Sequence, residues 1–97
     1  MNTTVFKESL PGKEPPGSAS VYLKALWYDA KGDWSKAHEL IQDMEDQNAC
    51  RIHAYLHRKE GDAFNANYWY RRAGTGMPSF SLTEEWEQIL TALSGTG

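Results

Sequence analysis

The chain contains one pattern of residues twice, in ALWYDAKGDWSKAHEL (residues 25–40) and in AYLHRKEGDAFNANYW (residues 54–69). Each copy begins with Ala, reaches Gly-Asp seven residues later and returns to Ala four residues after the Asp. Glycine ends helices because it readily adopts the left-handed backbone, and aspartate caps the next helix because its side chain accepts hydrogen bonds from free N–H groups. The pairs Gly32-Asp33 and Gly61-Asp62 therefore predict two tight turns, each joining two antiparallel helices.

Apolar residues recur at helical spacing in five segments, and none shows the alternation of a β-strand. We expect helices over about residues 18–31, 34–46, 48–60, 63–73 and 81–93. One helix hairpin leaves an apolar stripe uncovered, and a second hairpin stacked against it covers that stripe. The predicted fold is all-α, with two stacked antiparallel hairpins and a C-terminal capping helix. In the fourth helix the residues expected to be buried are Phe64, Ala66, Trp69, Tyr70 and Ala73.

The two ends of the chain are predicted to lie outside this helical domain. Proline and glycine disfavour regular structure, and residues 1–17 are rich in both. We therefore expect a flexible arm over residues 1–17, the helical repeat domain over 18–94 and a disordered tail over 95–97. An alternative is that apolar side chains of the arm, such as Phe6, attach it to the domain surface.

The 97 residues carry a net charge of −3 and a single cysteine, Cys50. Binding to nucleic acid or to an acidic membrane needs clustered Lys and Arg, so both are excluded as main partners. The lone thiol is consistent with a reducing compartment. The N-terminal residues lack the apolar segment of a secretory signal, and no apolar run is long enough to span a bilayer. We therefore expect a cytoplasmic protein.

The repeated pattern resembles the tetratricopeptide repeat family over residues 20–73. The residues that carry the resemblance are Ala25, Tyr28, Gly32, Asp33, Trp34 and Ala37 in the first unit, and Ala54, Gly61, Asp62, Ala66, Tyr70 and Ala73 in the second. The chain departs from that family in its repeat offset, which is 29 residues from position 32 to position 61, against about 34 in the family. The resemblance implies a fragment of a right-handed solenoid. The second unit also looks like a family of small uncharacterised bacterial and fungal proteins, which implies no activity.

The resemblance further implies a concave groove lined by the first helix of each hairpin. The residues that it places there are Tyr22, Leu26, Asp29, Arg51, Tyr55 and Arg58. Aromatic and arginine side chains suit an extended peptide or its terminal carboxylate. The family's carboxylate clamp uses Lys and Asn where Tyr22 and Leu26 stand here, so that specific activity is not implied. An alternative is that Asp29 and Arg58 pair across the groove.

The segment YWYRR, residues 68–72, places aromatic and cationic side chains close together near a helix C-terminus. Tyr68 and Arg71 are candidates for a surface that recognises carboxylate, phosphate or an acidic peptide. The alternative is a solvated basic helix end with ordinary aromatic packing.

Three histidines form another candidate site. His53 and His57 are four residues apart and share one helix face, as helical metal sites require, and His38 on the preceding helix is a candidate third ligand. The alternatives are core-edge histidines bonded to neighbours, or a site for an organic ligand or polar peptide. Asp33 and Asp62 are explained by helix capping without catalysis.

The first functional hypothesis is a non-enzymatic module that binds a protein or peptide and uses no cofactor. The second is a small-molecule-binding or metal-binding protein, or an enzyme, that uses His38, His53, His57 and Arg58, with Glu60 beside them. A third is self-association, because tryptophans exposed on the monomer would be covered in a homodimer.

Overall fold

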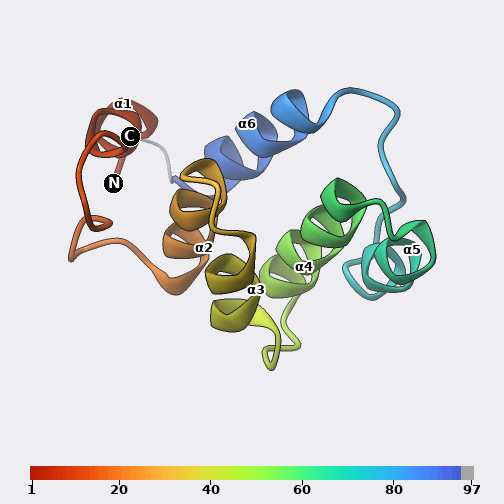
Figure 1. Ribbon diagram of the computed structural model, residues 1–97. Helices are drawn as coiled ribbons and strands as arrows, with labels where there is room; N and C mark the ends of the chain where they lie inside the picture. Colours follow the sequence, from red (N-terminus) through yellow and green to blue (C-terminus); the bar gives the residue numbers. More distant parts are fainter. Residues whose placement is uncertain (95–97) are drawn as a thin grey trace.

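A computed structural model describes residues 1–94, which form six α-helices and no strand. The helices are α1 (Thr3–Ser9), α2 (Val21–Ala30), α3 (Trp34–Ile41), α4 (Gln47–Glu60), α5 (Ala63–Arg72) and α6 (Leu82–Leu93). Helix α2 packs against α3 and α4 against α5, and α6 runs back across α4 towards α2 (Figure 1). The all-α class predicted from the sequence is confirmed. The tail predicted over 95–97 lies outside the described residues.

Both Gly-Asp pairs form the predicted turns. Gly32 and Gly61 have φ angles of 85° and 89°, in the left-handed region that favours glycine. The Asp33 carboxylate accepts a hydrogen bond from a backbone N–H in the first turn of α3, and the Asp62 carboxylate does the same for α5. The capping role predicted for both aspartates is therefore confirmed.

Small residues let the paired helices approach closely. Ala37 in α3 and Ala66 in α5 have no exposed surface. A larger side chain at either position would push the two helices of its hairpin apart.

Helix α3 is shorter than predicted, because it ends at Ile41 instead of continuing to about residue 46. Asp46 has an extended backbone, with ψ of 163°, and its side chain caps α4. A residue that caps the next helix cannot also continue the previous one, so the chain must leave α3 before it reaches Asp46.

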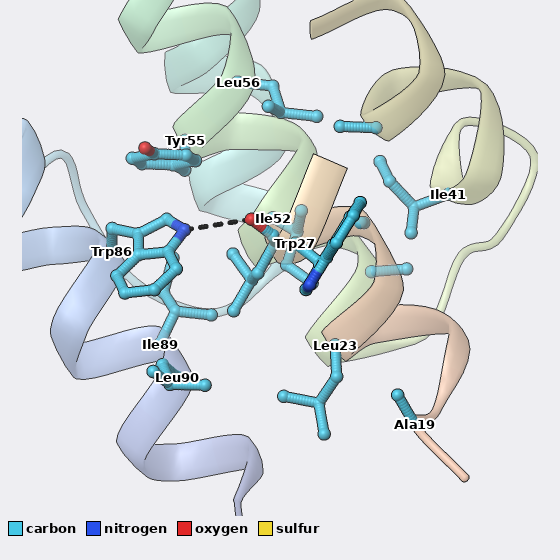
Figure 2. Close-up of a cluster of buried hydrophobic side chains, with 14 of the residues drawn as sticks. Ala19, Leu23, Trp27, Ile41, Ile52, Tyr55, Leu56, Trp86, Ile89 and Leu90 are labelled. Atoms are coloured by element: carbon cyan, nitrogen blue, oxygen red, sulfur yellow. Dashed lines mark hydrogen bonds between the residues drawn. The ribbon is translucent and has the colours of Figure 1, made fainter. Parts of the chain in front are cut away.

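The main core lies where α2, α4 and α6 meet. Trp27 of α2, Ile52 of α4 and Trp86 of α6 pack together there (Figure 2). The Trp86 indole Nε1 donates a hydrogen bond to the backbone oxygen of Leu26 at 3.2 Å. Helix α6 therefore packs on α2 and α4, the first helix of each hairpin.

The prediction of irregular structure throughout residues 1–17 is wrong for α1. Asn2 caps this helix, and Phe6 is completely buried, with its ring 6.0 Å from that of Trp86. The Trp27 indole Nε1 donates to Ser9 Oγ at 3.1 Å, which fixes the end of α1 against α2. The helix forms because every proline of the segment lies after it in the sequence.

The prediction that Phe64 is buried is also wrong, since the residue is 85% exposed. The inner face of α5 is set by Ala66, Tyr70 and Ala73, which are buried at the spacing of one helix face. Phe64 lies on a different face of the same helix.

None of the helices described in residues 1–94 is both long enough and apolar enough to cross a membrane.

Candidate functional site

The groove implied by the family resemblance is occupied by α6. Arg58 donates to the Glu85 carboxylate at 2.8 Å and to the backbone oxygen of Phe80, both of which belong to α6 or the loop before it. Glu85 is 1% exposed and also accepts a hydrogen bond from the Tyr70 hydroxyl at 2.6 Å. Burial and then this bond raise the pKa of Tyr70. Arg58 therefore holds α6 in place and is not free to bind a peptide.

Asp29 and Tyr55 do meet, as the groove predicted, but in the interior. Asp29 is 2% exposed and accepts from the Tyr55 hydroxyl at 2.7 Å and from Lys59 Nζ at 2.8 Å. Burial, followed by the charge of Asp29, raises the pKa of Tyr55. The alternative pairing of Asp29 with Arg58 is wrong, because each has a different partner.

The remaining predicted contact residues lie apart from one another. The Tyr22 hydroxyl donates to Asp46 at 2.8 Å, which raises the pKa of Tyr22. Arg51 lines a separate polar pocket at the start of α4. Tyr68 accepts from Arg72 at 3.0 Å on the outer face of α5, and Arg71 is exposed beside it. The structure therefore does not bring these residues into one surface.

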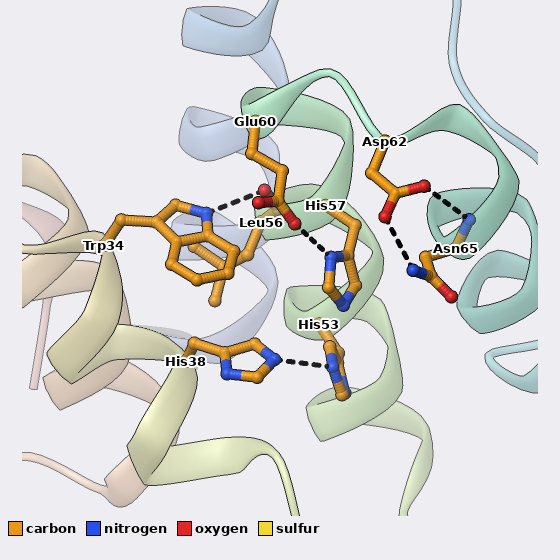
Figure 3. Close-up of polar contacts among 8 residues, drawn as sticks. All are labelled: Trp34, His38, His53, Leu56, His57, Glu60, Asp62 and Asn65. Atoms are coloured by element: carbon orange, nitrogen blue, oxygen red, sulfur yellow. Dashed lines mark hydrogen bonds and ion pairs between the residues drawn. The ribbon is translucent and has the colours of Figure 1, made fainter.

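The three histidines do come together, between α3 and α4 (Figure 3). His38 Nε2 lies 3.0 Å from His53 Nε2. One nitrogen from each of His38, His53 and His57 lies within 4.8 Å of the other two, a spacing at which the rings could hold a metal ion. The four-residue spacing on α4 and the turn after α3 are the local features that bring the rings together.

Two tryptophans enclose this histidine cluster, defined as His38, His53 and His57. Trp34 stacks on His38 with ring centroids 4.8 Å apart and planes at 9°, and Trp69 stacks on His53 at 4.0 Å and 17°. The Trp34 indole donates to the backbone oxygen of Leu56 at 2.8 Å, which fixes its ring. The walls of the cluster are therefore aromatic, and the Trp34 wall is held in place by its hydrogen bond.

Burial keeps two rings of the cluster, His38 and His53, uncharged. Burial, followed by the charges of His38 and His57, lowers the pKa of His53 to about 4. The pKa of His38 is also lowered, first by burial and then by His57. Both rings are therefore neutral at pH 7, the form in which imidazole donates a lone pair to a metal.

The hydrogen bonds of His38 and His53 indicate which ring nitrogen of His53 carries the proton. His53 is 4% exposed, and its Nδ1 has no hydrogen-bond partner among the described residues. A buried N–H without an acceptor costs more than a buried lone pair without a donor, so the proton of His53 belongs on Nε2. His53 Nε2 then donates to His38 Nε2.

His57 is oriented by an acidic neighbour. Its Nδ1 lies 2.6 Å from Glu60 Oε2, and the side chains are 12% and 39% exposed. A carboxylate bonded to one ring nitrogen fixes the orientation of the ring, as is common for histidines that bind metal. His57, Glu60 and Asp62 also form a second group with metal-ligand spacing on the outer side of the cluster.

Sequence reasoning identified the histidines and Glu60, but it wrongly placed Arg58 with them. It also missed Trp34 and Trp69 as the walls. The signal for Trp34 was present, because it lies four residues before His38 and therefore on the same helix face. Comparisons of the chain with protein-family models, with curated proteins and with solved structures found no match.

Proposed function

We propose that this protein binds a divalent transition-metal ion of the zinc type at the histidine cluster. The observation that carries the proposal is the convergence of three imidazole nitrogens from two helices within 4.8 Å. Imidazole is a common ligand for zinc, copper, iron and nickel in proteins. Three protein ligands would leave one coordination position for water or another small ligand.

The distance between the ring nitrogens of His38 and His53 is close to that expected when both bind one metal ion. Zinc–nitrogen bonds of about 2.0–2.1 Å in tetrahedral geometry place neighbouring nitrogens about 3.4 Å apart. The 3.0 Å between His38 Nε2 and His53 Nε2 is slightly shorter, so an ion would spread this pair by a few tenths of an ångström.

Loading has one identifiable cost. An ion on His53 Nε2 displaces the proton to Nδ1, which has no acceptor among the described residues. An unsatisfied buried donor costs about 1–3 kcal/mol. This cost is small beside the roughly 10–16 kcal/mol with which zinc-finger peptides bind zinc.

The test is calorimetric titration of the protein with Zn²⁺, repeated with Co²⁺ to report ligand geometry. We expect one ion per chain and a Kd at least about 100-fold weaker in His38→Ala, which removes a ligand from a half-buried position. Glu39→Ala is the matched control, because Glu39 is the exposed next residue of α3 and should leave the Kd unchanged. Equal affinity of His38→Ala and the unchanged protein would exclude the site.

Binding to another protein is a second candidate function, and the exposure of Phe64 is the observation that favours it. Phe64 is 85% and Tyr68 42% exposed, one turn apart on α5. If the partner is a different protein, it should be captured by the unchanged protein and lost in Phe64→Asp. If the partner is a second copy of this chain, the unchanged protein should self-associate in sedimentation equilibrium and Phe64→Asp should not. Val5→Asp, at a 50% exposed apolar residue, is the control. A partner that Phe64→Asp still retains would rule this face out.

A further inference from the structure

A cavity separate from the histidine cluster opens where the ends of α1 and α2 meet α4 and the start of α6. Its volume is about 460 Å³, within the range of about 300–1,000 Å³ of small-molecule sites. Its apolar walls include Leu10, Ala30, Leu82 and Trp86. This cavity is therefore mainly apolar and large enough for a molecule the size of one substituted aromatic ring.

One cation at the edge of this cavity is accessible to a ligand. Lys59 Nζ bonds to Asp29 Oδ1 at 2.8 Å, and the two side chains are 38% and 2% exposed. An ammonium group has three N–H donors, and Asp29 uses one of them. Asp29 itself is buried and already bonded at both oxygens, to Lys59 and to Tyr55. A ligand can therefore reach hydrogen-bond donors on Lys59 more easily than acceptors on Asp29.

Glu87, the remaining charged residue of the cavity wall, also has an ion-pair partner. Glu87 bonds to Lys7 at 2.8 Å, and both side chains are more exposed than that of Asp29, at 42% and 45%. Thr83 adds an exposed hydroxyl to the same wall. The accessible polar groups thus favour a ligand with an acceptor, because charge-assisted bonds from an ammonium to a carboxylate are the stronger kind.

We propose that this cavity binds a small organic acid, with its apolar body against Leu82 and Trp86 and its carboxylate on Lys59 Nζ. An amine of the same shape would meet the Lys59 charge and would have to displace a bond already made to Asp29. An uncharged amide would keep the apolar contact but lose the charge-assisted bond. The expected order of affinity is acid, then amide, then amine.

The experiment follows backbone amide signals of the full chain by NMR during titration with phenylacetate, phenylacetamide and phenethylamine. Phenylacetate should shift the amides of Ala30, Lys59 and Thr83 and bind at least about tenfold more tightly than phenethylamine, which corresponds to about 1.4 kcal/mol. Ala30→Phe fills the cavity from an exposed position and should weaken phenylacetate binding at least about tenfold. Ala92→Phe makes the same change at an exposed position of α6 outside the cavity wall and should have no effect.

Thr83→Phe fills the same cavity from α6 and gives a second reading if Ala30→Phe disturbs the fold. The double variant Lys59→Met with Asp29→Asn removes the cation without leaving a buried carboxylate unpaired, and it should reduce phenylacetate to the affinity of phenylacetamide. The proposal is overturned if phenylacetate causes no shifts, if phenethylamine binds as tightly, or if neither filling variant weakens binding. None of these readouts involves a metal, so this proposal and the metal-binding proposal can fail separately.

Discussion

Replacing Phe6 with alanine is expected to lower the free energy of unfolding by about 3–5 kcal/mol. The side chain has no exposed surface and its ring lies 6.0 Å from that of Trp86, so its loss removes apolar contacts and leaves a void between α1 and α6. Urea unfolding is the measurement, because a lower midpoint with an unchanged slope reports a change in stability alone.

The matched control is Val5→Ala, in the same helix at a residue that is 50% exposed. Surface substitutions of this kind change stability by only about 0.5 kcal/mol. If Phe6→Ala costs no more than Val5→Ala, α1 does not dock on the core in solution. That result would also remove Leu10 as a wall of the proposed organic-acid cavity.

The parts of the fold that the sequence predicts best are those set by local chemistry. The Gly-Asp turns depend on the left-handed backbone of Gly32 and Gly61 and on the aspartate caps next to them, all of which can be read within a few residues. The docking of α1 could not be read in this way. It depends on Phe6 reaching Trp86, a contact between residues far apart in the sequence.

The same difference between local features and long-range contacts explains which site residues could be predicted from the sequence. His53 and His57 share a helix face by spacing alone, and the short connection from α3 brings His38 to them. Arg58 follows His57 in the sequence, but one residue along a helix turns the side chain by about 100°, towards α6. The groove was inferred from the first helices of the two hairpins, and a helical pattern at residues 82–93 does not reveal which surface that helix will cover.

The second large effect is expected at the ion pair between Arg58 of α4 and Glu85 of α6. Replacing Arg58 with methionine keeps much of the side-chain volume but leaves Glu85, 1% exposed, without its cation. Removing one partner of a buried ion pair costs about 3–5 kcal/mol, because the other charge stays buried without compensation. The Tyr70 hydroxyl, 2.6 Å from Glu85, offsets only part of this cost since it carries no charge.

Arg72→Met is the control, because Arg72 makes an ion pair with Glu45 in which the side chains are 39% and 76% exposed. Exposed pairs of this kind contribute about 0–1 kcal/mol. The double variant Arg58→Met with Glu85→Leu removes both charges and is expected to recover most of the stability that Arg58→Met loses. Urea unfolding of the unchanged protein, the single variants Arg58→Met and Glu85→Leu, and the double variant measures the coupling between the two side chains. If Arg58→Met costs no more than Arg72→Met, then Glu85 is not buried against α4 in solution, and α6 does not occupy the groove between the hairpins as described.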